Sequence, residues 1–142
     1  MNWRKLGRIY QPSGRREWAQ SHASVPIADH RSGDIFRIIY TSRDAQNRSH
    51  VGWFEIDLGN PMSILDESDT PLLAPGKPGA FDMDGVMASA LVARGDEKRL
   101  YYIGWNRAVG VPFRNSIGLA VQSGDTDRFE RYADGPVLDR SP

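Results

Sequence analysis

The feature that most constrains this chain is an internal repeat, because the second half follows the pattern of the first. Five residue matches lie 64 to 66 positions apart, and a drift of one or two residues is what small changes in loop length produce. The matches are Ala23 with Ala88, Arg43 with Arg107, Gly52 with Gly118, Pro71 with Pro136, and Leu73 with Leu138. The chain is therefore expected to contain two copies of one structural unit.

Each half contains four short segments that are typical of strands and are bounded by turn-forming residues; most are rich in β-branched and aromatic residues, whereas 63–73 is weaker and more polar. These segments cover 21–28, 35–41, 51–58 and 63–73 in the first half, and 86–92, 100–105, 116–121 and 129–138 in the second. No segment of helix length carries a sustained apolar period of 3.6 residues. The pattern predicts an all-β fold with four antiparallel strands in each unit.

Two all-β architectures fit eight short strands. A β-sandwich would accommodate them, but a sandwich gives no reason for the sequence to repeat. Tandem four-stranded sheets are the organisation of β-propeller blades, so the repeat favours a propeller. The expected division is a lead-in at 1–20, a first blade at 21–80 and a second at 81–142. Two blades are too few to close a propeller, and they would leave an open sheet edge.

Composition excludes several classes of function. The 18 basic and 18 acidic residues balance, whereas a nucleic-acid binder usually carries a basic excess, so no nucleic-acid partner is expected. There is no cysteine, which removes disulfides and thiolate metal sites, and no metal or cofactor is predicted. No apolar run reaches the roughly 20 residues that a membrane helix needs, and no signal peptide is recognisable. A cytoplasmic location without membrane contact is the resulting expectation.

Several segments of both halves resemble one family of known proteins. In the second half these are 81–89, 101–107, 111–120 and 135–142, and in the first half 21–26 and 40–44. They are similar to the five-bladed β-propeller glycoside hydrolase group, which contains arabinanases, β-xylosidases, invertases and levansucrases. The segment Tyr101–Arg107 is the most specific of them. The resemblance covers essentially the whole chain.

The resemblance implies that this chain holds the first two of five blades. Members of the group usually have about twice this length. The chain would then be a truncation, half of a split protein, or a form that oligomerises. Its last residues, 139–142, stop within a motif, which favours truncation. The remaining blades would come from a second chain, or the open edges would be covered by self-association.

Asp82 and Asp84 are the predicted catalytic residues. Glycosidases use a pair of carboxyl groups, and closely placed carboxylates raise one another's pKa, as a general acid requires. The two residues lie two positions apart, and therefore on one side of the chain if the segment is extended. The alternative is that 82–85 forms a turn, since Asp-Gly is a common turn pair. From the residues and the resemblance together, the two interpretations are balanced.

His22 stands where many members of the group carry their first catalytic Asp, and Ala90 lies near a second expected carboxylate position. The third expected carboxylate would fall beyond residue 142. A histidine can hydrogen-bond sugar hydroxyls, but it does not replace the usual carboxylate base. These departures weigh against ordinary hydrolysis.

Further side chains are predicted to position a substrate. An arginine can donate forked hydrogen bonds to an acidic sugar, although ion pairing with a nearby acid is the commoner role of any single arginine. Trp105 is a candidate for stacking against a sugar ring, with core packing as an equal alternative, and Trp53 is predicted to be core. The predicted substrate-binding residues are His22, Arg43, Trp105, Asn106, Arg107 and Arg114.

The function expected from these features is that of a glycoside hydrolase-like, carbohydrate-active protein that binds a saccharide in the propeller channel. The alternative is a non-catalytic sugar-binding or scaffold propeller linked to polysaccharide assembly. His22 in place of an acidic residue favours the alternative.

Overall fold

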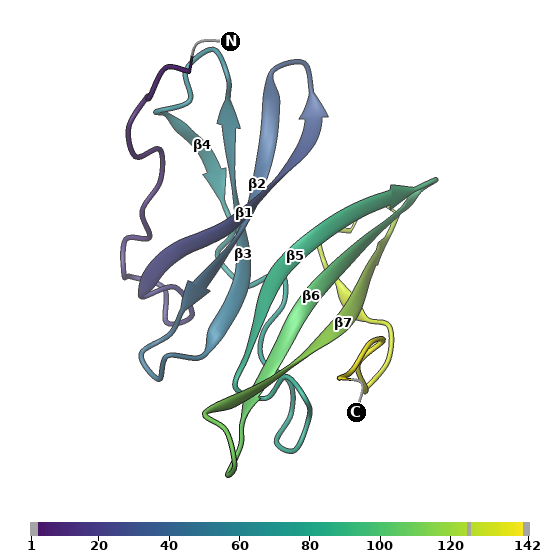
Figure 1. Ribbon diagram of the computed structural model, residues 1–142. Coiled ribbons are helices and arrows are strands. Elements are labelled where there is room, and N and C mark those ends of the chain that lie inside the picture. Colours follow the sequence, from purple (N-terminus) through teal and green to yellow (C-terminus); the bar gives the residue numbers. More distant parts are fainter. Residues whose placement is uncertain (1–2, 125, 141–142) are drawn as a thin grey trace.

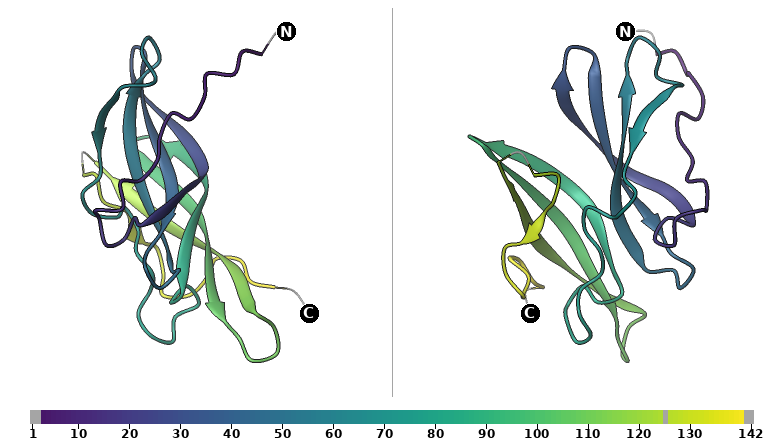
Figure 2. Two further views of the ribbon diagram at one scale, coloured as in Figure 1. Left: turned by 90° about the vertical axis from the view of Figure 1, so that its left-hand side faces the viewer. Right: turned by 180° about the vertical axis from the view of Figure 1, so that it is seen from behind.

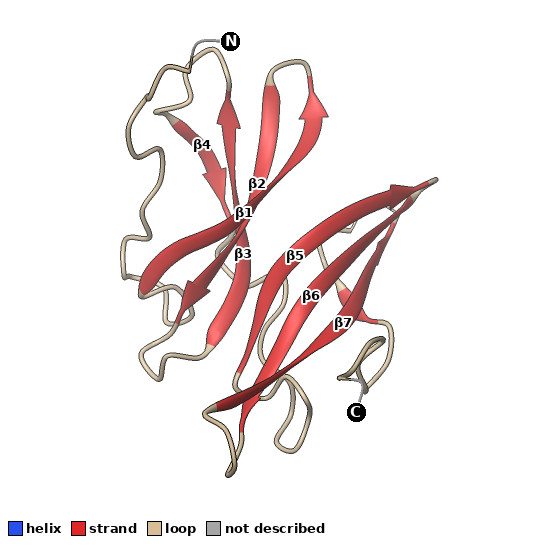
Figure 3. Ribbon diagram, in the orientation of Figure 1, coloured by secondary structure: helices blue, strands red, loops and turns tan. Residues whose placement is uncertain are grey.

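The computed structural model describes residues 3–124 and 126–140, and within them the fold consists of strands and loops (Figure 3). The all-β prediction is confirmed. The strands are β1 Ser21–Ser32, β2 Ile35–Arg43, β3 Ser49–Asp57, β4 Ile64–Glu67, β5 Gly85–Arg94, β6 Glu97–Arg107, β7 Phe113–Ser123 and β8 Glu130–Arg131. Among the described residues there is no helix with the length and apolar character needed to cross a membrane.

The eight strands form one mixed sheet that does not close, in the order β1-β2-β3-β5-β6-β7-β8, with β4 also paired to β3. All strand pairs are antiparallel except β3 with β5, which meet in parallel at the single pair Ser49–Gly85. This pair joins two antiparallel groups, β1–β4 and β5–β8, which we call the first and second units. Figure 1 shows them side by side, and Figure 2 shows the β6–β7 hairpin projecting from the second unit.

Both units contain the same isolated bridge between the third strand and the segment after the fourth. In the first unit Val51 pairs with Leu73, and in the second Ile117 pairs with Leu138. The main-chain hydrogen bonds match as well: Val51 N donates to Leu73 O over 2.9 Å, and Ile117 N to Leu138 O over 2.8 Å. These residues lie 66 and 65 positions apart, so the repeat found in the sequence is also a repeat of backbone pairing.

The register of strand pairing corrects one of the five residue matches found between the two halves of the sequence. Thr41 is the partner of Val51, and Ile103 is the partner of Ile117, which makes Arg43 equivalent to Trp105. The predicted match of Arg43 with Arg107 is therefore displaced by two residues. The cause is that the β6–β7 hairpin is longer than the β2–β3 hairpin. Its ladder continues for two pairs beyond Trp105–Asn115, as far as Arg107–Phe113.

The main core lies between the two units. Ile39, Val51 and Trp53 of the first unit pack with Leu100 and Tyr102 of the second, and all five are buried. Trp53 is thus a core residue, as the sequence predicted. Apolar area removed from water at this contact is the main force that holds the units together.

Residues 3–20 form no regular strand, but they pack on the far face of the first unit. The Tyr10 ring is stacked on Phe54 with 4.2 Å between ring centroids, and the Tyr10 hydroxyl donates to Glu67 over 2.7 Å. Trp18 is buried against Gly52, where an added Cβ would lie only 2.1 Å from the indole ring. This lead-in therefore closes the outer face of the first unit.

Charged contacts reinforce the contact between the units. Lys98 of β6 donates to Asp29 of β1 over 2.5 Å. The Arg37 guanidinium lies 3.8 Å from the centroid of the Trp53 ring and pairs with Glu55 and with Asp127 of the second unit. Each of these charges thus has a partner near the half-buried interface, which offsets the cost of removing it from water.

Gly85→Ala tests the junction of the two units. A Cβ at position 85 would lie 2.3 Å from both Ser49 Oγ and Trp105 Nε1, so these two groups would have to move apart. We expect the free energy of unfolding, measured by urea denaturation, to fall by about 1–3 kcal/mol. Gly110→Ala is the control, because nothing lies within 4 Å of its added Cβ. Equal stability of the two variants would contradict this account of the junction.

Candidate functional site

One row of backbone pairs crosses both units at the end of the sheet where β1 and β5 begin. Each residue of this row is paired with the next in a neighbouring strand. We call it the end row, and its members are Ser21, Arg43, Ser49, Gly85, Trp105 and Asn115. A row that is continuous over five strand pairs places side chains from both halves of the chain along one edge.

Most of the predicted site residues either belong to the end row or lie within two positions of it. Arg43 and Trp105 belong to it, and Arg107 is two positions beyond it in β6. The residues next to a member of the row are His22, Asp84, Asn106 and Arg114. Residues predicted from separate parts of the sequence are thus brought to the same end of the sheet, with Asp82 as the exception.

Trp105 connects the two units at the end row. Its indole Nε1 donates to Ser49 Oγ over 2.7 Å, and the Arg43 guanidinium lies 6.0 Å from its ring centroid. The side chain is half-buried. Trp105 therefore packs across the junction and still presents part of its surface, so the two roles considered for it are compatible.

His22 is exposed and has an unusual backbone conformation. Its φ of 65° is in the left-handed region, and Val25 follows with a φ of 47°. The β1–β2 register shifts twice over the same stretch, between Ser21 and Ile27. The His22 Nδ1 is 2.9 Å from Ser21 Oγ, beside a surface hollow of about 380 Å³. Such backbone strain is commonly found at functional sites.

Asp84 is mostly buried at the start of β5. Its Oδ2 accepts a hydrogen bond from the Arg107 backbone N over 2.7 Å, and its Oδ1 is 4.0 Å from Arg107 Nε. Two predicted site residues are therefore in direct contact. The contact fixes the carboxylate relative to the β6–β7 hairpin and places a positive charge beside it.

Asp82 has a different environment, although it is only two positions away. Its side chain is 1% exposed, and Oδ2 accepts hydrogen bonds from the Tyr102 hydroxyl at 3.0 Å and from Arg131 Nε at 2.9 Å. Burial, together with the Asp82 charge, raises the pKa of Tyr102 above its usual range. Arg131 also donates to Ala74 O, so this cluster connects β6 and β8 of the second unit to the segment between β4 and β5.

The segment 82–85 is a turn, as the alternative interpretation of the Asp-Gly pair held. Gly85 N donates to Asp82 O over 3.2 Å, and the residues before β5 have turn geometry. The expectation that Asp82 and Asp84 share one side depended on an extended chain. The turn instead directs Asp82 into the core and leaves Asp84 at the end row.

A buried pair formed by Asp44 and His50 was not identified from the sequence, which began the third strand at residue 51 and so left His50 outside it. Asp44 Oδ2 accepts from Arg48 Nε at 2.8 Å and lies 3.0 Å from His50 Nε2. Burial acts to raise the pKa of Asp44, but hydrogen bonds from His50 and Arg48 outweigh it, and the pKa lies below its ordinary value. Burial lowers the pKa of His50, and its contact with Asp44 opposes this only in part.

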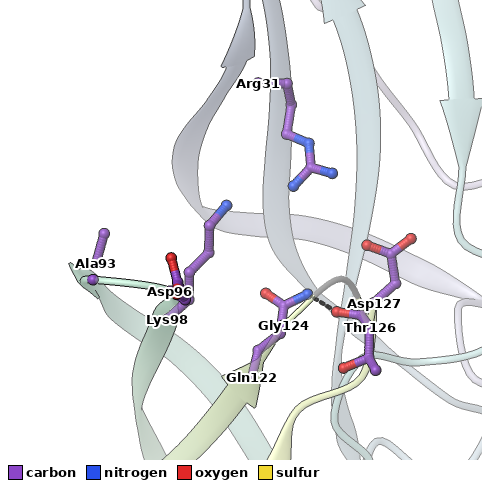
Figure 4. Close-up of a pocket in the computed structure, with 9 residues that line it drawn as sticks. Arg31, Ala93, Asp96, Lys98, Gln122, Gly124, Thr126 and Asp127 are labelled. Atoms are coloured by element: carbon purple, nitrogen blue, oxygen red, sulfur yellow. Dashed lines mark hydrogen bonds between the residues drawn. The ribbon is translucent and has the colours of Figure 1, made fainter.

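The opposite end of the sheet contains a polar hollow of about 370 Å³, bordered by Arg31, Lys98, Gln122 and Asp127 (Figure 4). Most of its charges are already paired. Lys98 binds Asp29, Arg31 lies 3.7 Å from the same carboxylate, and Asp127 binds Arg37. In the described part of the chain, no three His, Asp or Glu side chains gather as a metal site requires. The end row therefore remains the stronger candidate site.

No protein-family model matches this chain. Two curated relatives, the Mycobacterium tuberculosis proteins Rv1502 and MT1551, both named as uncharacterized, are 47% identical to it over 138 residues. The match covers 97% of this chain and 46% of each relative. The chain thus spans about half the length of the curated relatives it matches.

Solved structures share the fold. A glycoside hydrolase of Bacteroides ovatus, whose assignment is itself provisional, matches with a TM-score of 0.69 and 17% identity, over 93% of this chain and 39% of that one. A glycosyl hydrolase, also from Bacteroides ovatus, matches with a TM-score of 0.68 and 14% identity, over 90% and 38%. A glycosidase of Bacteroides thetaiotaomicron, likewise of provisional assignment, matches with a TM-score of 0.68 and 17% identity, over 90% and 39%. The chain therefore has the fold of part of these proteins.

His50 should make the stability of the protein depend on pH. An unfolded histidine binds a proton below about pH 6.5, whereas burial lowers the pKa of His50 in the folded state. Unfolding then takes up a proton, so the free energy of unfolding should decrease as the pH falls from 7.5 to 5, by at most about 1.4 kcal/mol per pH unit for one proton. His50→Gln should flatten this dependence in urea titrations.

The matched control for this measurement is His30→Gln, since His30 lies exposed in β1. It should leave the slope of stability against pH unchanged. If His50→Gln kept the same dependence of stability on pH as the unmodified protein, His50 would not be the source of that dependence.

Proposed function

We propose that this chain is part of a glycoside hydrolase-like β-propeller and binds a saccharide at the end row. The observation that carries the proposal is the convergence of His22, Arg43, Trp105 and Asp84 from both units on one edge of the sheet. The likeness of the fold to part of two glycoside hydrolases supports the same class of ligand. On this proposal the first and second units are two propeller blades.

The chemistry of the end row suits a sugar. A saccharide presents hydroxyl groups that need fixed donors and acceptors, and an apolar ring face that packs on an aromatic side chain. Exposed Arg114 and His22 and half-buried Asn106 and Trp105 supply both kinds of contact. The arginine fork would also bind an acidic sugar.

The residues of this chain support binding better than they support hydrolysis. Hydrolysis of a glycoside ordinarily needs two carboxyl groups that face the scissile bond. The carboxylates described within two positions of the end row are Asp84 and Asp44, and Asp44 is buried against His50 and Arg48. Asp82 is held by Arg131. A second catalytic carboxylate would then come from the part of the longer protein that this chain does not span.

The second candidate is a non-catalytic sugar-binding propeller. His22 at the expected position of an acidic residue, together with the ion pair that holds Asp82, favours it. The two candidates share the ligand and the site, and they differ in whether Asp84 takes part in bond cleavage.

Binding is tested by isothermal titration of this chain with a panel of neutral and acidic oligosaccharides. His22→Ala should weaken the affinity for a bound saccharide by about threefold to tenfold and Arg43→Ala by about tenfold or more, because an ordinary hydrogen bond contributes about 0.5–1.5 kcal/mol and one to a charged group about 1.5–3 kcal/mol. The matched controls, His30→Ala and Arg31→Ala, change the same residue types at the far end of β1 and should bind normally. If the two control variants lost as much saccharide affinity as the two end-row variants, the end row would not be the binding site.

Catalysis is tested on any glycoside that the protein cleaves. Asp84→Asn should lower kcat at least about a hundredfold if Asp84 is the general acid or base. Asp82→Asn should instead lower the thermal stability, since it breaks a buried ion pair, which typically costs about 3–5 kcal/mol. Cleavage that survives Asp84→Asn intact would remove Asp84 from the mechanism, and binding without cleavage of any glycoside would favour the non-catalytic candidate.

A further inference from the structure

The hollow of about 380 Å³ beside His22 lies between the lead-in and the start of β1. Residues 8 and 10–12 of the lead-in form one wall, and residues 20–23 form the other. Figure 1 shows the lead-in following the first unit to the start of β1. Ser21 is the first member of the end row, so the hollow adjoins the row at that end.

The described residues that line this hollow include an arginine, Arg8, but no aspartate or glutamate. Two other hollows differ in this respect. Asp96 and Asp127 border the hollow at the opposite end of the sheet, and Glu67 and Asp69 border a hollow between the lead-in and β4. The hollow beside His22 therefore presents the positive charge of Arg8 without an opposing carboxylate in its walls.

Hydrogen-bond donors predominate among the side chains of the hollow. Arg8 Nη1 donates to Gln11 Oε1, which occupies the amide oxygen and leaves the amide nitrogen of Gln11 to donate. A guanidinium has five N–H donors, so most of those of Arg8 are also left for a ligand. His22 is exposed, and its contact with Ser21 Oγ uses Nδ1, which leaves Nε2. Such a set of donors suits a negatively charged oxygen group.

Both walls of the hollow are anchored to the first unit. In the wall that carries Arg8, Pro12 is buried and the Tyr10 ring is stacked on Phe54. In the other wall, the backbone N of Gln20 donates to Arg43 O over 2.8 Å. The donors are therefore held in place before a ligand arrives, which lowers the entropic cost of binding.

Two arginines at this place have no carboxylate partner. Within the described residues no ion pair includes Arg8 or Arg43, whereas Arg16 and Arg48 each bind an acidic side chain. Arg43 is paired with Ser21, the member of the end row that borders the hollow. The planar fork of an arginine matches the geometry of a carboxylate or a phosphate. Both guanidinium groups can therefore receive an anionic ligand.

We propose that this hollow is an anion subsite of the end row, in which Arg8 binds a negatively charged substituent of the saccharide. The sugar ring lies at the row, and its carboxylate or phosphate enters the hollow between Arg8 and His22. The inference rests on the proposed function and narrows it to acidic saccharides. It also gives the lead-in a part in binding, in addition to covering the outer face of the first unit.

Isothermal titration of this chain with matched probes tests the subsite. Trigalacturonate and its methyl ester have the same sugar skeleton and differ in charge, and glucose 6-phosphate and glucose make the same comparison for a phosphate. The charged member of a pair should bind about tenfold or more tightly than the neutral one, because hydrogen bonds to charged groups are the stronger ones. The pair that shows the preference identifies the anionic group as a carboxylate or a phosphate.

Arg8→Gln should remove the preference, with about a tenfold or greater loss of affinity for the charged probe and unchanged affinity for the neutral one. Arg8→Lys should keep part of the preference, since it retains the charge but not the fork. Arg4→Gln is the matched control, because Arg4 is exposed in the same lead-in and does not line the hollow. It should leave the preference intact.

The outcomes separate this inference from the proposed function. Equal affinity for charged and neutral saccharides would overturn the anion subsite and leave the end row as a site for neutral sugars. A charge preference that survives Arg8→Gln would overturn the assignment of the anion to this hollow. If this chain bound none of the saccharides, both the subsite and the proposed function would be rejected.

Discussion

The missing side chain of Gly85 is the constraint on which the rest of the arrangement depends. Because no Cβ separates them, Ser49 and Trp105 meet across the junction of the two units and share a 2.7 Å hydrogen bond. That contact holds Trp105 close to Arg43, and it aligns two four-stranded groups into one continuous end row. The apolar contact between the units supplies most of the stabilisation, while this polar junction determines how their edges are matched.

The turn at 82–85 gives its two carboxylates different surroundings. Asp82 and Asp84 differ by two positions, yet one is buried with Arg131 and Tyr102, and the other is held at the edge by the Arg107 backbone. A buried carboxylate requires a full set of partners, since an unpaired charge in the interior is costly. Asp82 Oδ1 has no hydrogen-bond partner in the described residues, so the contacts of Oδ2 with Arg131 and Tyr102 carry the whole compensation. These contacts make Asp82 a residue that holds the surrounding loops together.

The sequence predicted the strands well because their signals are local: alternating or β-branched runs and the turns between them. The two-residue extension of the β6–β7 ladder has no such signal, and it displaced the match of Arg43 from Trp105 to Arg107. The partnership of Asp82 with Arg131 spans 49 positions, and a single sequence carries no local pattern for so distant a contact. The third strand was predicted to begin at residue 51 because turn residues precede it, whereas the pairing of His50 with Ser42 extends β3 to include His50.

The repeat also relates two positions of the end row to each other. Ser49, whose hydroxyl accepts the hydrogen bond of Trp105, is equivalent to Asn115 in the shared register. Asn115 is exposed at the end of the row, beside Arg114 and Phe113. The same position of the repeat is therefore occupied in the first unit, where Trp105 donates to Ser49, and exposed in the second, where Asn115 lies beside Arg114. On the proposed function, the Asn115 amide adds a hydrogen-bonding group for a saccharide at the end of the row farthest from His22.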